Sequence, residues 1–142
     1  MQALLEHRFP SDTAQLEPVR HRVRETLEAY GCAHEFTETS VLAVDEAISN
    51  VMRHGYGSCG KGELSLKIGV DGTQLVFGLR DFAKPFDVST RDLPSTGEVR
   101  AGGYGLALIR EIMDSVRYSN AIEGQGNLLE MRRRLQLATQ EG

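Results

Sequence analysis

The sequence predicts an α/β fold: a two-layer sandwich in which helices cover one face of a mixed or antiparallel sheet. After a short candidate strand come two segments with apolar residues at helical spacing. Two hairpin-like pairs of strands follow, with a third helical segment between the pairs. Helices and strands that each have one apolar face bury those faces against each other. With 142 residues and 15.7 kDa, the chain has the size expected of one compact domain, residues 1–142.

The N-terminal part is expected to contain a short strand and a helix. Residues 3–9 are the candidate strand, and Ser11 or Asp12 can cap the helix that follows. The helical spacing is carried by Leu16, Val19, Val23 and Leu27. Gly31 is the expected stop, because glycine readily takes the left-handed conformation found after a helix C-terminus.

A second helix is predicted to begin with Thr37 or Thr39 as its cap and to run to about His54. Its apolar stripe consists of Val41, Val44, Ile48 and Val51. Glu46, Asn50 and His54 fall four residues apart on roughly the opposite face. A carboxylate, an amide and an imidazole on one stripe can hold a metal ion and steer a proton, although an ordinary solvated face has the same pattern.

The first hairpin is predicted from residues 63–70, which alternate apolar and polar, and from residues 73–81, with the turn signal Asp71-Gly72 between them. In the second strand one face carries Leu75, Phe77 and Leu79, and Asp81 continues it. A carboxylate at the end of a buried stripe is costly unless it is paired. Asp81 therefore either caps the loop that follows or accepts a hydrogen bond from a ligand held against the sheet.

A glycine-rich segment precedes the third helix, which is expected at residues 104–113. Gly102, Gly103 and Gly105 allow a close approach of the backbone to a ligand, and a helix start offers free N–H groups. Together they suit a phosphate, although a flexible loop is the alternative. The segment is no Walker A loop, because no Gly-Lys-Ser/Thr follows, and Leu108 breaks the dinucleotide fingerprint.

The last hairpin is expected from residues 115–121 and 127–135. The three arginines at 132–134 lie in its second strand, where alternate residues face opposite sides, and they are interpreted as mainly surface residues. Residues 82–103 have little periodicity, and a loop of this length in a compact domain is usually functional or disordered.

The composition excludes several classes of protein. A net charge of −4 and a pI near 5.6 argue against a general nucleic-acid binder. No run approaches the ~20 apolar residues of a membrane span, and the N-terminus lacks a signal-peptide core. Cys32 and Cys59 stand alone, so zinc is not expected, and two free thiols are typical of a cytosolic protein.

Three segments, in this order, resemble the GHKL ATPase superfamily, which includes histidine kinases and DNA gyrase. They read LAVDEAISNVMRHGYG, RDFAKPFD and GGYGLALIREIMDSVRYSN. The run from Gly126 to Met131 also resembles the last strand of that family. The resemblance covers about residues 9–135 and is strongest to the small anti-sigma-factor serine/threonine kinases of bacteria.

The resemblance implies a role for each polar residue singled out above. Asn50 would ligate Mg²⁺, Asp81 would accept a hydrogen bond from the adenine amino group of ATP, and Glu46 would be the general base toward an incoming hydroxyl. Arg100 is a candidate γ-phosphate contact, with a solvated charge as the alternative. His54 is interpreted as a helix-end or supporting group.

The remaining nucleotide contacts are also implied by the resemblance. The phosphate cradle would consist of Gly102, Gly103, Tyr104, Gly105 and Leu106. The loop after Asp81 normally reads Asp-x-Gly-x-Pro-Phe in the family, so Ala83 and Phe86 would also contact the nucleotide. Ala83 replaces the glycine, and alanine adopts positive φ only at a cost, which puts the strength of nucleotide binding in doubt.

Two functions follow from these expectations. The first is a cytoplasmic anti-sigma factor that binds a sigma factor and uses ATP to phosphorylate an antagonist protein. It would form a homodimer through its N-terminal strand and helix and would contact neither nucleic acid nor membrane. The second is a module that sequesters a regulator with weak or no use of ATP. Glu46 and Asn50 favour the kinase, whereas Ala83 favours the binding module.

Overall fold

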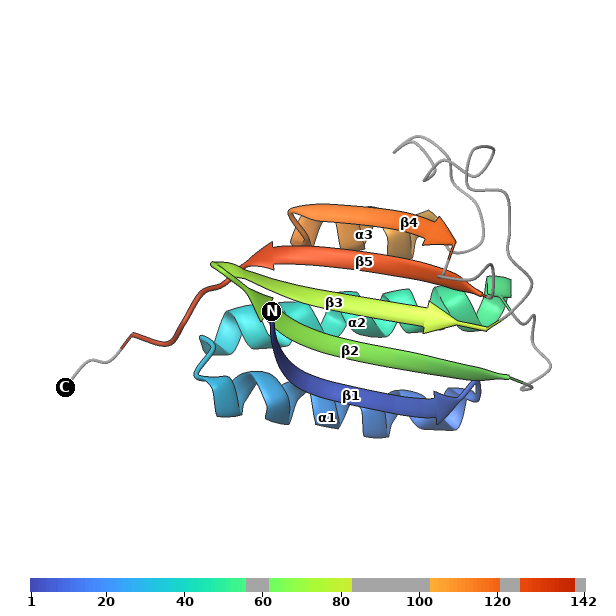
Figure 1. Ribbon diagram of the computed structural model, residues 1–142, viewed down its shortest axis with the longest axis horizontal. Helices are drawn as coiled ribbons and strands as arrows, with labels where there is room; N and C mark the ends of the chain where they lie inside the picture. The colour runs from blue at the N-terminus through green and yellow to red at the C-terminus, as the bar shows by residue number, and fades with distance from the viewer. Residues whose placement is uncertain (56–61, 83–102, 121–125, 140–142) are drawn as a thin grey trace.

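The computed structural model describes residues 1–55, 62–82, 103–120 and 126–139 (Figure 1). In chain order the elements are β1 (Gln2–Pro10), the short 3₁₀ helix η1 (Thr13–Gln15), α1 (Leu16–Tyr30), α2 (His34–Gly55), β2 (Glu63–Asp71), β3 (Gln74–Asp81), α3 (Gly103–Ile112), β4 (Ser115–Asn120) and β5 (Asn127–Arg134). No helix in these ranges is both long enough and apolar enough to cross a membrane.

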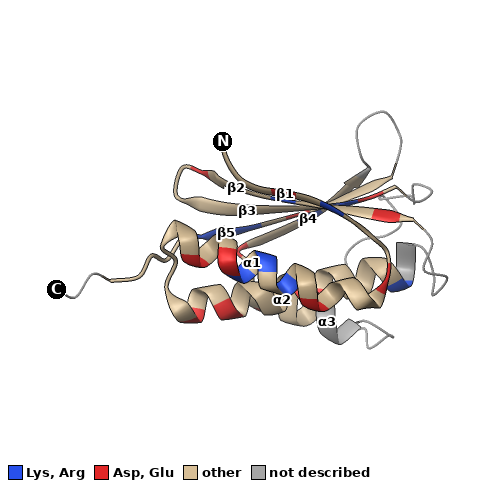
Figure 2. Cartoon of the chain, turned by 90° about the horizontal axis from the view of Figure 1, so that it is seen from below, with Lys and Arg blue, Asp and Glu red and all other residues tan. Residues whose placement is uncertain are grey.

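The strands form one sheet in the order β1-β2-β3-β5-β4, and every neighbouring pair is antiparallel. The helices α1, α2 and α3 all lie on one face of this sheet (Figure 2). The predicted sandwich is therefore confirmed, with an antiparallel rather than a mixed sheet. Because β5 enters between β3 and β4, the last strand of the chain lies inside the sheet.

The predicted start and end of the first helical region are confirmed. Asp12, one of the two candidate caps, accepts a hydrogen bond from the backbone N–H of Ala14 at 2.9 Å. Gly31 ends α1 with φ of 100°, and its N–H donates to the carbonyl of Glu28 at 3.0 Å.

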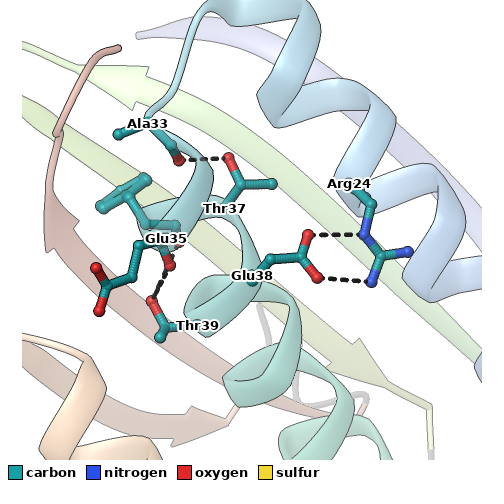
Figure 3. Close-up of polar contacts among 7 residues, drawn as sticks. Arg24, Ala33, Glu35, Thr37, Glu38 and Thr39 are labelled. Atoms are coloured by element: carbon teal, nitrogen blue, oxygen red, sulfur yellow. Dashed lines mark hydrogen bonds and ion pairs between the residues drawn. The ribbon is translucent and has the colours of Figure 1, made fainter. Parts of the chain in front are cut away.

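The predicted cap of α2 is wrong, because the helix begins at His34, before both threonines. The hydroxyl of Thr37 donates to the carbonyl of Ala33, and that of Thr39 donates to the carbonyl of Glu35, each at 2.9 Å (Figure 3). A threonine within a helix can bond back to the carbonyl four residues earlier in this way. The same polar side chain therefore suits a helix interior as well as a helix start.

Two ion pairs fix α1 against α2. The guanidinium of Arg24 donates to both carboxylate oxygens of Glu38 at 2.8 and 3.1 Å (Figure 3). This hydrogen bonding lowers the pKa of Glu38 below its usual range. Further along, Arg20 Nη1 lies 3.0 Å from Asp45 Oδ1. The carboxylate of Asp45 is thereby held toward α1. The acid considered as a general base is the next residue, Glu46.

The core lies between the helix layer and the sheet. Its strand residues include Leu64, Leu66, Ile68, Leu75, Phe77 and Leu79, and its α2 residues include Val41, Val44, Ile48 and Val51; all are buried. Both predicted apolar stripes are thus confirmed.

The arginines at 132–134 were expected to alternate faces and to lie mainly at the surface, and none of them is buried, but Arg133 is half-buried and points toward the helix layer. Its Nη1 donates to the carbonyl of Phe36 at 3.0 Å and to the hydroxyls of Thr39 (2.8 Å) and Ser40 (2.9 Å). Strand alternation turns this residue toward the helix layer, where the guanidinium also lies over the Phe36 ring. Burial lowers the pKa of Arg133 below its usual value.

Candidate functional site

The segments that carry the predicted site meet at one end of the sandwich. At this end α2 and β3 finish, and α3 and β5 begin (Figure 1). The antiparallel register sets Asp81, the last residue of β3, opposite Asn127, the first residue of β5. The helices α2 and α3 pack against each other, so the polar stripe of α2 and the start of α3 belong to neighbouring elements.

Asn50 is turned into the molecule, with only 7% of its surface exposed. Its Oδ1 accepts a hydrogen bond from the guanidinium of Arg53 at 2.6 Å. A solvated face would leave this amide exposed, so the burial of Asn50 favours the site interpretation of the polar stripe.

The donor chemistry at Asn50 suits magnesium. An amide oxygen is a hard ligand, and Mg²⁺ typically takes one or two protein oxygens together with phosphates and water. Within the described ranges no three His, Cys, Asp or Glu side chains form a metal cage. The buried amide oxygen of Asn50 fits the small share of ligands that a protein supplies to a metal held mainly by phosphates.

Glu46 lies one turn before Asn50 on α2 and is half-buried. Residues four apart share a helix face, so the carboxylate and the amide are neighbours along α2. Asp45, the adjacent acid, is tied to Arg20 instead. The side chain of His54, the third member of the predicted stripe, lies outside the description.

Asp81 is buried, with 4% of its surface exposed, as its place at the end of the apolar stripe predicts. The side-chain amide of Asn127 donates to its Oδ1 at 3.0 Å. A carboxylate offers about four acceptor positions and can accept from more than one donor at a time. The bond from Asn127 therefore fixes the orientation of a buried acceptor at the end of β3.

Gly126 supports Asp81 as well. It has φ of 80°, and a Cβ built on it would overlap the carbonyl oxygen of Asp81 and come within 3.0 Å of the Cα of Phe82. From the sequence, Gly126 and Asn127 were predicted to belong to the last strand, and no role in the site was predicted for them. The Gly-Asn pair at the start of a strand was the available signal, but its meaning depends on the register between β3 and β5.

The glycine-rich segment is described in part. Gly103, Tyr104 and Gly105 are the first residues of α3, so the expected helix start is confirmed, with Gly105 inside the helix. The side chain of Leu106 is buried in the core. The remaining positions predicted to contact the nucleotide lie outside the described residues: Ala83, Phe86, Arg100 and Gly102.

Comparison with known proteins places this arrangement in a family. Residues 9–133 match the family of histidine kinase-like ATPase domains. The curated relatives include proteins named serine-protein kinase RsbW. That of Oceanobacillus iheyensis is 26% identical over 125 residues, which is 82% of this chain and 78% of the relative. That of Bacillus subtilis is 27% identical over 124 residues, again 82% and 78%. That of Listeria monocytogenes is 32% identical over 95 residues, 61% of this chain and 60% of the relative.

Solved structures share the fold. The RsbU and RsbW domains of a Mycobacterium tuberculosis protein match with a TM-score of 0.66 and 18% identity, over 95% of this chain and 34% of that one. The Acinetobacter baumannii histidine kinase AdeS matches with a TM-score of 0.53 and 16% identity, over 93% of this chain and 68% of that one. This chain thus spans about a third of the Mycobacterium tuberculosis chain. On the evidence of the match over residues 9–133, the chain belongs to the histidine kinase-like ATPase domain family.

Proposed function

We propose that this chain is an anti-sigma factor with ATP-dependent serine/threonine kinase activity toward an antagonist, anti-anti-sigma protein. The whole of residues 1–142 would form one ATP-binding domain. Membership of the ATPase family and the curated relatives named as serine-protein kinases support the activity. The observation that carries the proposal is that two polar side chains, Asn50 and Asp81, are buried at the end of the sandwich where α2 and β3 finish.

Each of these side chains has a task in nucleotide binding. Asp81, oriented by Asn127, accepts a hydrogen bond from the adenine amino group. Guanine presents a carbonyl at the equivalent position, which a carboxylate repels. Asn50, whose Oδ1 accepts from Arg53 in this structure, would hold Mg²⁺ through that oxygen, and the metal would supply positive charge to the phosphates. The backbone at the start of α3, with Gly102, Ala83 and Phe86 from outside the described residues, completes the nucleotide contacts.

Glu46 acts on the acceptor rather than on the nucleotide. Its carboxylate orients the hydroxyl of a serine or threonine and takes its proton as the oxygen bonds to the γ-phosphorus and the bond to ADP breaks. The half-buried position of Glu46, one turn from Asn50, suits a base that meets a protein substrate beside the metal.

Asp81→Asn is expected to weaken ATP binding by about 10²-fold. A neutral amide would replace the buried carboxylate, so the adenine amino group would lose its charged acceptor. Wild type is expected to prefer ATP or ADP strongly over GTP. Isothermal titration calorimetry measures both. Asp71→Asn is the matched control, since Asp71 is an exposed strand-end acid paired with Arg132 at 3.0 Å. Equal affinities of wild type for ATP and GTP would contradict the assignment.

The activity is tested by transfer of radiolabel from γ-labelled ATP to a cognate antagonist protein. Transfer by wild type supports the kinase. Binding of a sigma factor without any transfer would instead favour the alternative, a module that sequesters a regulator with weak or no use of ATP.

The partners follow from the same proposal. The chain binds a sigma factor and the antagonist in the cytoplasm, with no direct contact to nucleic acid or membrane. It forms a homodimer through β1 and α1, since β1 is an edge strand of the sheet and an open groove between β1 and α1 is lined by Leu4, Leu5 and Tyr30 among others. Sedimentation equilibrium measures the assembly, and a mass of 15.7 kDa would contradict the dimer.

A further inference from the structure

Phe82, the residue directly after Asp81, contacts two arginines from different strands. The guanidinium carbon of Arg8 lies 4.4 Å from the centroid of the Phe82 ring, and that of Arg80 lies 4.8 Å from it. Both distances are within the range of a cation–π interaction. Arg8, Arg80 and Phe82 are called the Phe82 cluster below.

The sheet register explains why these side chains meet. Arg8 of β1 pairs with Ser65 of β2, and Ser65 pairs with Arg80 of β3, so the two arginines belong to one row across three strands. Strand alternation puts this row on the face opposite to Asp81 and the helices. Ser65 is small and separates the arginines without a bulky side chain. Arg8 is also held by Glu63, with 3.3 Å between Nη2 and Oε1.

The Phe82 cluster fixes the backbone that carries the buried acceptor. Asp81 and Phe82 are adjacent, so one peptide connects a carboxylate on the helix side with a ring on the other side. Asn127 holds the carboxylate, and the arginines hold the ring. Gly126 packs so closely here that even a Cβ would overlap the carbonyl of Asp81. A small shift of Phe82 would therefore move the carboxylate of Asp81.

We propose that Phe82 is a positioning residue for nucleotide binding, anchored by Arg8 and Arg80 on the outer face of the sheet. The inference rests on the proposed function, because it takes Asp81 as the adenine contact. Its consequence is that nucleotide affinity depends on Arg8, a residue of the edge strand that lies on the face opposite to the site. A purely structural Phe82 would cover the sheet surface and affect stability alone.

Substitutions at Phe82 distinguish the contribution of the aromatic ring from the contribution of the apolar volume of the side chain. Phe82→Leu retains an apolar side chain but removes the π face, and is expected to weaken ATP binding about fivefold or more. Phe82→Tyr retains the ring and is expected to recover most of that loss. Calorimetric titration with Mg-ATP gives the affinities, and thermal unfolding of the same samples gives the stabilities. Loss of stability in Phe82→Leu with wild-type ATP affinity would overturn the inference.

Arg8→Gln tests the dependence on the edge strand and changes only an exposed side chain. It is expected to weaken ATP binding about two- to fivefold, and to have little further effect in a Phe82→Leu background, because the shared contact is already lost. Lys67→Gln is the matched control: Lys67 pairs with Glu6 at 3.7 Å on the same two strands and the same face. Equal ATP affinities of Arg8→Gln and Lys67→Gln would overturn the inference.

A spectroscopic readout follows from the composition, since the chain contains no tryptophan. Phe82→Trp gives a single fluorophore within the Phe82 cluster. Adding Arg8→Gln is expected to shift its emission to longer wavelength, as the ring loses its cover, whereas adding Lys67→Gln is expected to leave the emission unchanged. Identical spectra for all three proteins would contradict the cluster itself. If wild type binds no ATP, the proposed function fails instead, and the fluorescence result still reports on the contact.

Discussion

Glu46→Gln is expected to reduce phosphotransfer to the antagonist protein by about 10²-fold or more, the usual scale for a positioned acid–base group. Nucleotide and sigma-factor binding should stay close to wild type, because the role proposed for Glu46 is on the acceptor hydroxyl. The measurement is radiolabel transfer from γ-labelled ATP, run beside a calorimetric titration with Mg-ATP. Label transfer at the wild-type rate would show that the chain is a kinase with a different base.

Two further variants make this result specific. Asp45→Asn is the matched control, since it changes the adjacent carboxylate, which is bound to Arg20, and should leave transfer near the wild-type rate. Asn50→Ala removes the oxygen assigned to the metal and should weaken Mg-ATP binding itself. A shared loss of transfer in all three variants, with equal nucleotide affinities, would contradict the separate roles of Glu46 and Asn50.

Gly126→Ala is expected to disrupt the site from the opposite strand. Positive φ alone costs an alanine about 1–2 kcal/mol. The added methyl would in addition overlap the carbonyl oxygen of Asp81, so the ends of β3 and β5 must separate. We expect the free energy of unfolding to fall by about 3 kcal/mol or more, the scale of overpacking added to backbone strain. ATP affinity should fall with it, because Asn127 moves away from Asp81.

Other glycines with positive φ provide the controls. Gly31 and Gly72 have φ of 100° and 61°, and a Cβ on either meets no atom within 4 Å. Gly31→Ala and Gly72→Ala should therefore lower the free energy of unfolding by about 1–2 kcal/mol through backbone strain alone, with ATP affinity unchanged. Urea unfolding and calorimetry measure both quantities. If Gly126→Ala resembles the controls in both, the close approach of Gly126 to Asp81 is of no consequence.

The fold could be predicted from the sequence because its signals are local. The Asp71-Gly72 turn and the alternation on either side of it specify a hairpin within 20 or so residues. In the same way, apolar residues at helical spacing and the stop at Gly31 specify α1 from neighbouring residues alone. The start of α2 was misassigned, because Thr37 and Thr39 satisfy the rules for a cap and for an interior residue that bonds back to a carbonyl.

In the candidate site, too, the features that depend on local sequence could be predicted, and those that depend on distant segments could not. Asp81 could be singled out because a carboxylate continues the apolar stripe of its strand, and Asn50 because it lies four residues from Glu46 on one helix face; both are buried. The support of Asp81 by Asn127 could not, because it depends on how β3 and β5 are aligned, 46 residues apart in the chain. The hydrogen-bond partners of Arg133 could not be predicted for a similar reason, since they lie on α2.

The position of β5 inside the sheet also determines when the site can exist during synthesis. Every residue assigned to the nucleotide and to catalysis, up to Leu106, leaves the ribosome before β5 does. Until then β3 has an open edge, and Asp81 has neither Asn127 nor Gly126 beside it. Pairing between distant strands is slow and exposes such edges. A nascent chain therefore carries the residues proposed to contact the ligand before it can hold Asp81 in place, so we expect nucleotide binding through Asp81 only after the last strand has been made.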